Sequence, residues 1–235
     1  EGDTIVVDPG VYYSGHPVAD ANDVRFALVL DKAVTVTSRN PDDPCSVAAT
    51  IIRGPGTVGS NQINNQGVLF TGATTRQTVF NGFTLENFGG SVINGGADGS
   101  RADHPDGYDG APVNGTAMIL LRGASPTIKN CIIRNNFAVG GNGGNGVGAD
   151  ATHNAGRGGW GGWARGGAIY CAPDTNPKFV TCVIENNYAQ GGNGGNGGAG
   201  VDNGGLANYG GNYTPSVRIN IDPDKLGAET VDSDL

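Results

Sequence analysis

Two stretches of the chain are near-copies of each other and decide the fold. The first is Pro126-Thr-Ile-Lys-Asn-Cys-Ile-Ile-Arg-Asn-Asn-Phe-Ala-Val-Gly-Gly-Asn-Gly-Gly-Asn-Gly146, and the second is Pro177-Lys-Phe-Val-Thr-Cys-Val-Ile-Glu-Asn-Asn-Tyr-Ala-Gln-Gly-Gly-Asn-Gly-Gly-Asn-Gly197. They align without a gap at an offset of 51 residues, and a more diverged copy, 78–88, precedes them. Such a long period is typical of repeat proteins, whose units bury their apolar side chains against their neighbours.

Each copy contains two short apolar segments, an asparagine and then a long glycine-rich stretch. The apolar residues alternate with a period of two, so that Phe83 and Leu85 share one face, as do Cys131 and Ile133. Helical periodicity is absent from the sequence. We therefore predict an all-β fold, a parallel β-helix solenoid in which equivalent residues of successive turns lie about 4.8 Å apart.

This stacking predicts which residues become neighbours. Asn87, Asn135 and Asn186 should lie in register at one corner, where each side-chain amide can bond the next. Cys131 and Cys182 should stack in the core as small buried side chains. A second core column is expected from Phe80, Ile128 and Phe179.

We expect a single β-helix domain over residues 1–235, with the N-terminal turns in about 1–87. The glycine-rich stretches are expected to be long loop insertions at one corner, at about 88–117, 138–167 and 189–215. The chain opens in strand-like sequence without an initiator Met or a signal peptide. We therefore expect a segment of a longer protein or a subunit of a fibre.

Two motifs resemble a known superfamily. The segment Gly2-Asp-Thr-Ile-Val-Val-Asp-Pro-Gly-Val-Tyr12 resembles the opening turn of right-handed, pectin-lyase-like β-helix proteins. Gly166-Gly-Ala-Ile-Tyr170 and the later pattern Cys-x-Ile-x-Asn-Asn resemble the repeat of polymorphic outer-membrane proteins and related bacterial surface proteins. The similarity covers about residues 1–190 and implies that the parallel β-helix is right-handed. It implies no single function, because the superfamily includes polysaccharide lyases, hydrolases, adhesins and structural proteins.

Composition excludes some classes of function. The net charge is −8, with only 14 Lys and Arg residues, which disfavours nucleic-acid binding because phosphate contacts need cations. No apolar run approaches the roughly 18 residues of a transmembrane helix. Glycine contributes 43 of 235 residues, far above the usual share of about 7 %.

The glycine-rich stretches repeat one string. Two of them contain Gly-Gly-Asn-Gly-Gly-Asn-Gly, a period of three that suits polyproline II geometry. If these stretches leave the solenoid one turn apart, they can pack side by side through backbone hydrogen bonds, because glycine has no Cβ. The alternative is a flexible solvated loop.

The first insertion contains a cluster of carboxylates. Asp98, Asp103, Asp106 and Asp109 lie within twelve residues, and Ca²⁺ prefers such oxygen ligands on a bendable loop. A calcium site is one prediction, and a solvated acidic turn is the other.

The second insertion contains both tryptophans of the chain, Trp160 and Trp163. Tryptophan in a glycine-rich loop can stack on a carbohydrate or a partner surface. It can equally fold back and anchor the loop on the solenoid, which would offset the entropy of ordering a glycine-rich segment.

The strands offer few catalytic groups. Glu86 and Glu185 occupy equivalent positions with Arg134 between them, which predicts a surface charge ladder rather than a catalytic carboxylate pair. The Gly-His-Gly and Asn-Thr-Asp motifs of polygalacturonases are absent from the sequence. We expect a non-catalytic structural or adhesive protein that is extracellular or on the cell surface. The open ends of its solenoid are covered by flanking domains or by head-to-tail copies, and the alternative is a polysaccharide-binding or polysaccharide-degrading β-helix.

Overall fold

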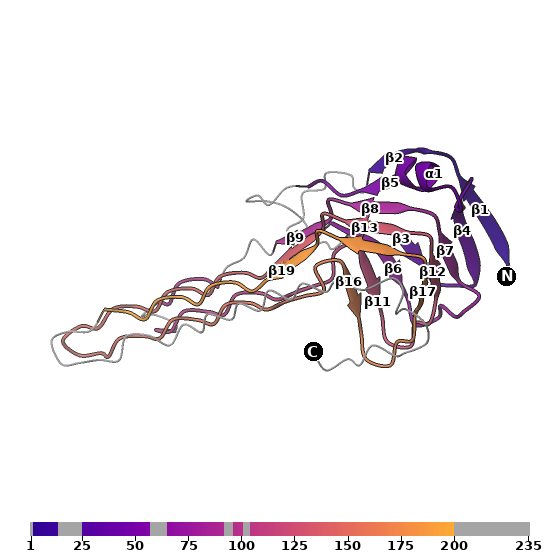
Figure 1. The fold of residues 1–235 in the computed structure, drawn as a ribbon. Coiled ribbons are helices and arrows are strands. Elements are labelled where there is room, and N and C mark those ends of the chain that lie inside the picture. The colour runs from indigo at the N-terminus through magenta and orange to yellow at the C-terminus, as the bar shows by residue number, and fades with distance from the viewer. Residues whose placement is uncertain (1, 14–24, 57–64, 92–95, 101–103, 200–235) are drawn as a thin grey trace.

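The computed structural model describes residues 2–13, 25–56, 65–91, 96–100 and 104–199 (Figure 1). In this part of the chain the fold is almost entirely β. Short strands succeed one another in three sheets, and nearly all neighbouring strands are parallel.

The sheets are built from strands that recur in chain order. The first contains, from edge to edge, β1 (Asp3–Val7), β4 (Val34–Ser38), β7 (Val79–Asn81), β12 (Thr127–Lys129) and β17 (Lys178–Val180). The second contains β2 (Gly10–Tyr13), β5 (Thr50–Arg53), β8 (Thr84–Glu86), β13 (Ile132–Arg134) and β18 (Val183–Glu185).

The third sheet has seven strands in two groups. One group is β3 (Arg25–Leu30), β6 (Asn65–Phe70), β11 (Met118–Leu120) and β16 (Ile169–Cys171), and the other is β9 (Gly89–Ser91), β14 (Phe137–Val139) and β19 (Tyr188–Gln190). A single antiparallel pair between β6 and β9 joins the groups. A separate pair is formed by β10 (Val113–Asn114) and β15 (Ala164–Arg165).

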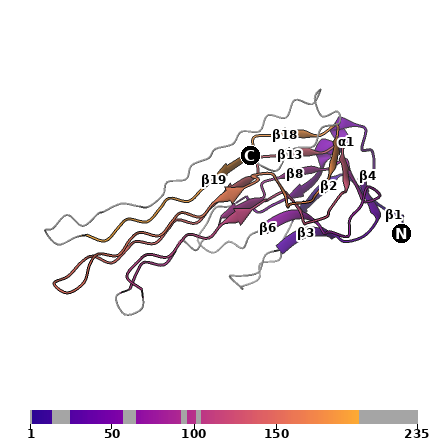
Figure 2. The same cartoon turned by 90° about the horizontal axis from the view of Figure 1, so that it is seen from below.

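The chain visits the sheets in a fixed cycle, from the first to the second to the third. Equivalent strands of successive cycles therefore lie beside one another (Figures 1 and 2). Several parallel sheets visited in this order are compatible with the predicted β-solenoid.

The register confirms the predicted aromatic and aliphatic column. Ile128 pairs with Phe80 on one side and with Phe179 on the other. Ile133 likewise pairs with Leu85 and Ile184. The middle members of these columns are fully buried. The core is therefore built from side chains at equivalent positions of consecutive turns.

The amide ladder lies one residue further along the chain than expected. Asn87, Asn135 and Asn186 take equivalent left-handed conformations, with φ of 58°, 56° and 53°, and asparagine tolerates this conformation well. The residue that follows carries the ladder. Fully buried Asn136 accepts the N–H of Phe88 (2.9 Å) and donates to Asn187 Oδ1 (2.9 Å).

Cys131 and Cys182 occupy equivalent positions just before β13 and β18, and both are buried thiols. The N–H of Val183 donates to the carbonyl of Cys131 (2.8 Å), which ties the two turns together at this point. Burial raises the pKa of the Cys131 thiol.

A short helix, α1 (Pro44–Ala49), interrupts the β pattern. Sequence periodicity predicted no helix. Asp43 caps the helix by accepting the N–H groups of Cys45 and Ser46 (both 3.1 Å), and Pro44 suits the first helical position. Six residues are too few to show a helical period, so only this cap could have revealed α1.

Glu86 lies between two arginines from neighbouring strands and is not the exposed group predicted. Its carboxylate accepts the Nε–H groups of Arg53 (2.8 Å) and Arg134 (3.0 Å), and its side chain is only 6 % exposed. The long arginine side chains cover it from both sides. Burial alone would raise the pKa of Glu86, but the bonds from Arg53 and Arg134 outweigh this effect and hold the pKa below its ordinary value.

Replacing Glu86 should destabilise the protein in a pH-dependent way. The pKa of this carboxyl is lower in the folded than in the unfolded chain, so its stabilisation is complete above the unfolded-state pKa and is lost as pH falls through the folded-state pKa. We expect Glu86→Gln to lower the free energy of unfolding by about 1–3 kcal/mol at neutral pH. Urea unfolding should show this difference shrinking below about pH 4. The exposed Glu185→Gln is the control, and an equal loss in both variants would contradict the assignment.

Asn136→Ala should be more harmful than a change at the neighbouring exposed corner residue. The alanine leaves the Phe88 N–H and the Leu85 carbonyl without their partner, which we expect to cost about 2–4 kcal/mol. Asn135→Gly keeps the left-handed corner and should change stability by less than about 1 kcal/mol. Urea unfolding midpoints compare the two, and equal effects would refute the ladder's importance.

Candidate functional site on a glycine-rich arm

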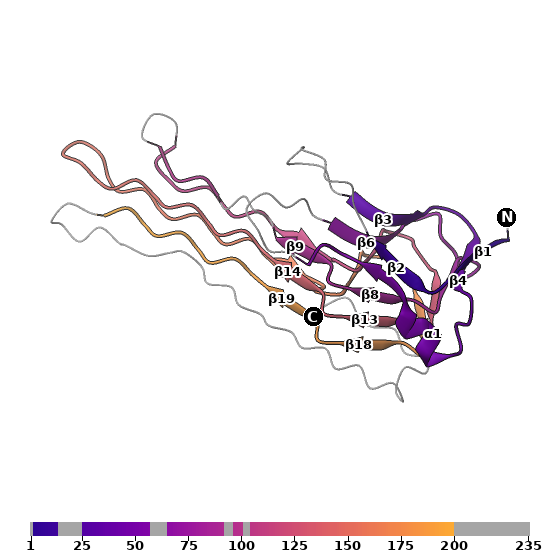
Figure 3. The ribbon, with the colours of Figure 1, turned by 90° about the horizontal axis from the view of Figure 1, so that it is seen from above.

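The glycine-rich segments form an arm that projects far beyond the sheets (Figures 1 and 3). We call this feature the glycine arm. Its outgoing segments, which follow β9, β14 and β19, are 96–100, 140–149 and 190–199, and its returning segments, which lead to β10 and β15, are 104–112 and 155–163.

Outgoing segments of successive turns run parallel and bond at every third residue. Gly140, Gly143 and Gly146 donate their N–H groups to the carbonyls of Gln190, Asn193 and Asn196 at 2.8, 2.8 and 2.9 Å. Gly96 and Gly99 donate in the same way to Asn142 (2.6 Å) and Asn145 (2.7 Å). The spacing is the three-residue period of a polyproline II helix.

Outgoing and returning segments bond antiparallel with the same period. Gly156, Gly159 and Gly162 donate to Val147, Gly144 and Gly141 at 2.8, 2.9 and 2.7 Å. Gly192, Gly195 and Gly198 donate to Gly162, Gly159 and Gly156 at 2.8, 2.8 and 2.9 Å. A segment inside the arm thus has hydrogen-bonded neighbours on several sides, as the packed alternative requires.

Glycine is needed here because the backbones are in contact. A Cβ on Gly144 would lie 2.0 Å from the carbonyl oxygen of Ala97, and one on Gly195 would lie 1.8 Å from that of Gly144. Both distances are far shorter than any contact a methyl group can make. The two glycines of each Gly-Gly-Asn triplet therefore form the interior of the arm.

The third residue of each triplet faces outward and still bonds the next turn. Its side-chain oxygen accepts the backbone N–H of the equivalent residue one turn later. These bonds join Asn145 to Asp98 (2.7 Å), Asn193 to Asn142 (2.9 Å), Asn196 to Asn145 (3.0 Å), Arg157 to Asp106 (2.7 Å) and Trp160 to Asp109 (2.8 Å).

Three of the four carboxylates of the predicted calcium site lie at outward third positions of the arm. Asp98 lies on an outgoing segment, whereas Asp106 and Asp109 lie on a returning segment, and each accepts one backbone N–H. Asp103 lies outside the described residues. Among the described residues, no group of three or more His, Cys, Asp or Glu side chains is placed to hold a metal ion.

The tryptophans are exposed and so do not anchor the arm by burial. Trp160 and Trp163 are 58 % and 52 % exposed. The guanidinium of Arg165 lies over the Trp163 ring, 4.3 Å from its centroid, an attractive cation–π contact. Their backbones are fixed, because Gly110 donates to the Trp160 carbonyl (2.7 Å) and Val113 to that of Trp163 (2.9 Å).

These side chains form a two-row surface that we call the acid–aromatic face. One row is Asp106 and Asp109 on the first returning segment, and the other is Arg157, Trp160 and Trp163 on the second. Hydrogen bonds from Arg157 to Asp106 and from Trp160 to Asp109 set the rows in register. Sequence reasoning found the tryptophans but not their pairing with the aspartates. The signal was the 51-residue offset, which also relates Asp109 to Trp160.

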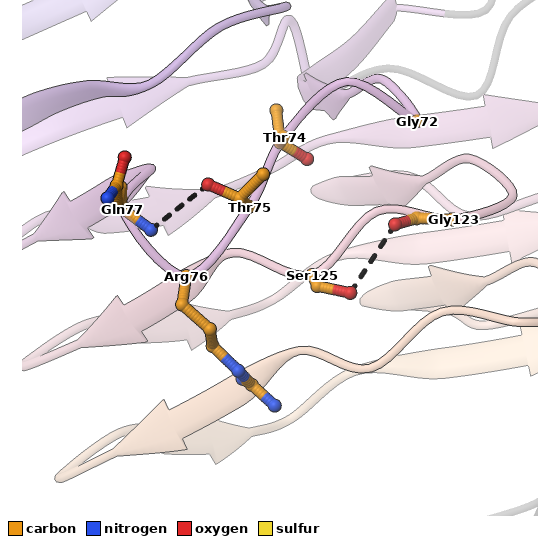
Figure 4. Close-up of a pocket in the computed structure, with 7 residues that line it drawn as sticks. All are labelled: Gly72, Thr74, Thr75, Arg76, Gln77, Gly123 and Ser125. Atoms are coloured by element: carbon orange, nitrogen blue, oxygen red, sulfur yellow. Dashed lines mark hydrogen bonds between the residues drawn. The ribbon is translucent and has the colours of Figure 1, made fainter. Parts of the chain in front are cut away.

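A second candidate is a polar hollow of about 520 Å³ at the turns between the third and first sheets (Figure 4). Its lining consists of Gly72, Thr74, Thr75, Arg76, Gln77, Gly123 and Ser125. Arg76, its cationic side chain, donates to Asn176 Oδ1 (2.9 Å) in a later turn. This arginine therefore has a structural role in joining turns of the chain. For that reason the acid–aromatic face, whose side chains are exposed, is the better candidate site.

Comparison with known proteins gives no match to any family model, curated protein or solved structure. Across the described residues, no helix has the length and apolar character needed to cross a membrane.

One methyl group should disrupt the arm if its backbones touch as observed. We expect Gly144→Ala to force neighbouring segments apart, at a local cost of about 1–3 kcal/mol. Amide hydrogen exchange over 140–146 should then become about tenfold faster or more. Gly148→Ala is the matched control, because its Cβ would lie 3.4 Å from the nearest atom. Unchanged exchange in Gly144→Ala would show that the arm is not packed in solution.

Proposed function

We propose that this chain is a non-catalytic structural and adhesive protein of the extracellular space or cell surface. In this proposal the sheets close into a right-handed parallel β-helix. Copies associate head to tail into a filament, and the glycine arm projects sideways as an insertion at one corner. The observation that carries the proposal is the match between the two ends of the stack.

The N-terminal end is apolar and exposed. Within the described residues, β1, β2 and β3 each pair with a strand on one side only, and unpaired edge strands are templates for further pairing. Ile5, Val11 and Val29 are 53 %, 42 % and 49 % exposed there. A hollow of about 360 Å³, lined mainly by apolar side chains including Ile5 and Leu28, lies at this end.

The other end contains the same sheets, and the apolar side chains of its core are only partly buried. The described part of the chain ends these sheets with β16, β17 and β18. Ile169, Phe179 and Ile184 are only partly buried there. Their counterparts one turn earlier, Met118, Ile128 and Ile133, are fully buried. A further turn of parallel strands would bury this surface.

The two edges of the glycine arm carry complementary backbone hydrogen-bonding groups. Along its outgoing segments, the first glycine of each triplet donates its N–H to a carbonyl of the following turn, as Gly140 and Gly143 do. In the last outgoing segment, the N–H groups of Gly191, Gly194 and Gly197 have no acceptor among the described residues. At the opposite edge, the backbone carbonyl of Asp98 has no donor there. Donors at one edge and acceptors at the other favour addition of a second copy in the same orientation.

A second candidate function, polysaccharide binding, is favoured by the acid–aromatic face. It is compatible with the filament, because the face uses the returning segments of the arm, whereas stacking uses the ends of the sheets and the edges of the outgoing segments.

Electron microscopy of the purified 235-residue chain tests the filament. We expect rods whose length increases with protein concentration, as mass action requires for end-to-end association. Ile5→Lys should shorten them to single subunits, because it places a charge against the apolar surface that stacking buries. Ile5 pairs with buried Val36 but is itself exposed, so the folded subunit should persist in circular dichroism.

Leu121→Lys is the control, because Leu121 is 41 % exposed in a turn away from both ends. It should leave rod length unchanged. A wild-type chain that sediments as a monomer over about a hundredfold range of concentration would refute head-to-tail association. Equal shortening by both lysine variants would also refute it.

A further inference from the structure

We propose that the acid–aromatic face binds a neutral, extended polysaccharide, with sugar rings stacked on Trp160 and Trp163 along the direction of the arm. This proposal specifies the contact behind the adhesive role proposed above and rests on it. It does not need the filament.

The spacing of the tryptophans is the first argument. They are three residues apart on a segment with a three-residue period, so their side chains leave the arm in the same direction. A polyproline II segment advances about 3.1 Å per residue, which puts the two rings about 9 Å apart along the arm. This distance is comparable with the length of two sugar units in an extended β-linked chain. Such a chain can therefore place alternate rings on the two indoles.

Preorganisation is the second argument. The backbone of Trp160 donates to Asp109 (2.8 Å) and accepts from Gly110 (2.7 Å), so the backbone of this residue is fixed before any ligand arrives. Arg165 lies over one face of the Trp163 ring and restrains it. Both tryptophan residues nevertheless remain more than half exposed. Rigid, exposed aromatic rings give a large contact area at a small cost in conformational entropy.

The polar row beside the rings is the third argument. Asp106 and Asp109 each use Oδ1 for a backbone N–H, and their Oδ2 atoms have no partner among the described residues. These oxygens can accept hydrogen bonds from sugar hydroxyls, and exposed Arg157 supplies donors in the adjacent row. Hydroxyl groups satisfy both kinds of partner.

Charge selects the neutral class of polysaccharide. The two aspartates of the face are balanced by Arg157 and by Arg165 over the Trp163 ring, but the whole chain has a net charge of −8. An anionic polymer would therefore be repelled on approach. Neutral chains keep the stacking and the hydrogen bonds without this repulsion.

Tryptophan fluorescence is a direct test, because the chain contains only these two tryptophans. We expect a saturable blue shift of the emission on titration with neutral β-glucan, xyloglucan or galactomannan, and no shift with polygalacturonate. Affinity electrophoresis in gels containing the same polymers should show the wild-type chain retarded. Trp160→Ala and Trp163→Ala should each weaken binding about tenfold, as expected for loss of one stacked ring.

Two further variants complete the test, one as a matched control and one as a test of the polar row. Tyr188→Ala removes an aromatic side chain of similar exposure that lies in β19, off the face, and should bind as the wild type does. Asp109→Asn keeps an oxygen for the Trp160 N–H, as Asn142 does for Asn193, and should weaken binding several-fold while hydrogen exchange in the arm stays unchanged.

The outcomes separate this proposal from the filament. The titration is repeated in the Ile5→Lys background, where binding should persist without rods. Absence of a shift with every neutral polymer would refute the carbohydrate ligand, as would tryptophan variants that bind the polymer as tightly as the wild type does. Retardation by polygalacturonate alone would refute the neutral class. A blue shift that depends only on protein concentration would assign the face to a second copy of the chain.

Discussion

Constant register between successive turns is the constraint on which the whole molecule depends. In the sheets, strands one turn apart pair residue for residue, as Ile128 does with Phe80 and Phe179. In the glycine arm, outgoing segments of successive turns likewise bond at every third residue. Because β9, β14 and β19 are neighbours in one sheet, the segments that follow them begin already aligned. This alignment lowers the entropic cost of bringing the segments together, whereas the backbone hydrogen bonds of the arm offset the cost of ordering its glycines.

Much of the stacking of successive turns could be predicted, because the repeat units are similar enough in sequence to be aligned. The 51-residue offset placed Ile128 and Phe179 in one column, and the diverged copy at 78–88 added Phe80. The amide ladder was assigned one residue too early, because both members of an Asn-Asn pair look alike in sequence. Only the backbone shows that the first takes the left-handed corner and the second turns inward. The depth of Glu86 was likewise hidden, since it follows from two arginine side chains that fold over it from neighbouring strands.

The aspartates and tryptophans of the candidate site stood out in the sequence, but Arg157 and the geometry of the face did not. Trp160 and Trp163 stood out by composition, and their exposure was left open between two alternatives. A loop was expected to need apolar burial to become ordered. Here the order comes from backbone hydrogen bonds between glycines, so the tryptophans are not needed as anchors and remain at the surface. The aspartates have a comparable explanation, because an outward third position bonds the next turn whether it is Asp or Asn.

The glycine arm also responds to temperature differently from the sheets. Burial of apolar side chains gives folding its large heat-capacity change and makes stability weaken on cooling. The interior of the arm is made of glycine backbone, with almost no apolar side chains to hydrate. Its unfolding therefore has a small heat-capacity change and a flat stability curve. The two parts of one molecule thus differ most near the freezing point of water, where the hydrophobic contribution is weakest and backbone hydrogen bonds persist.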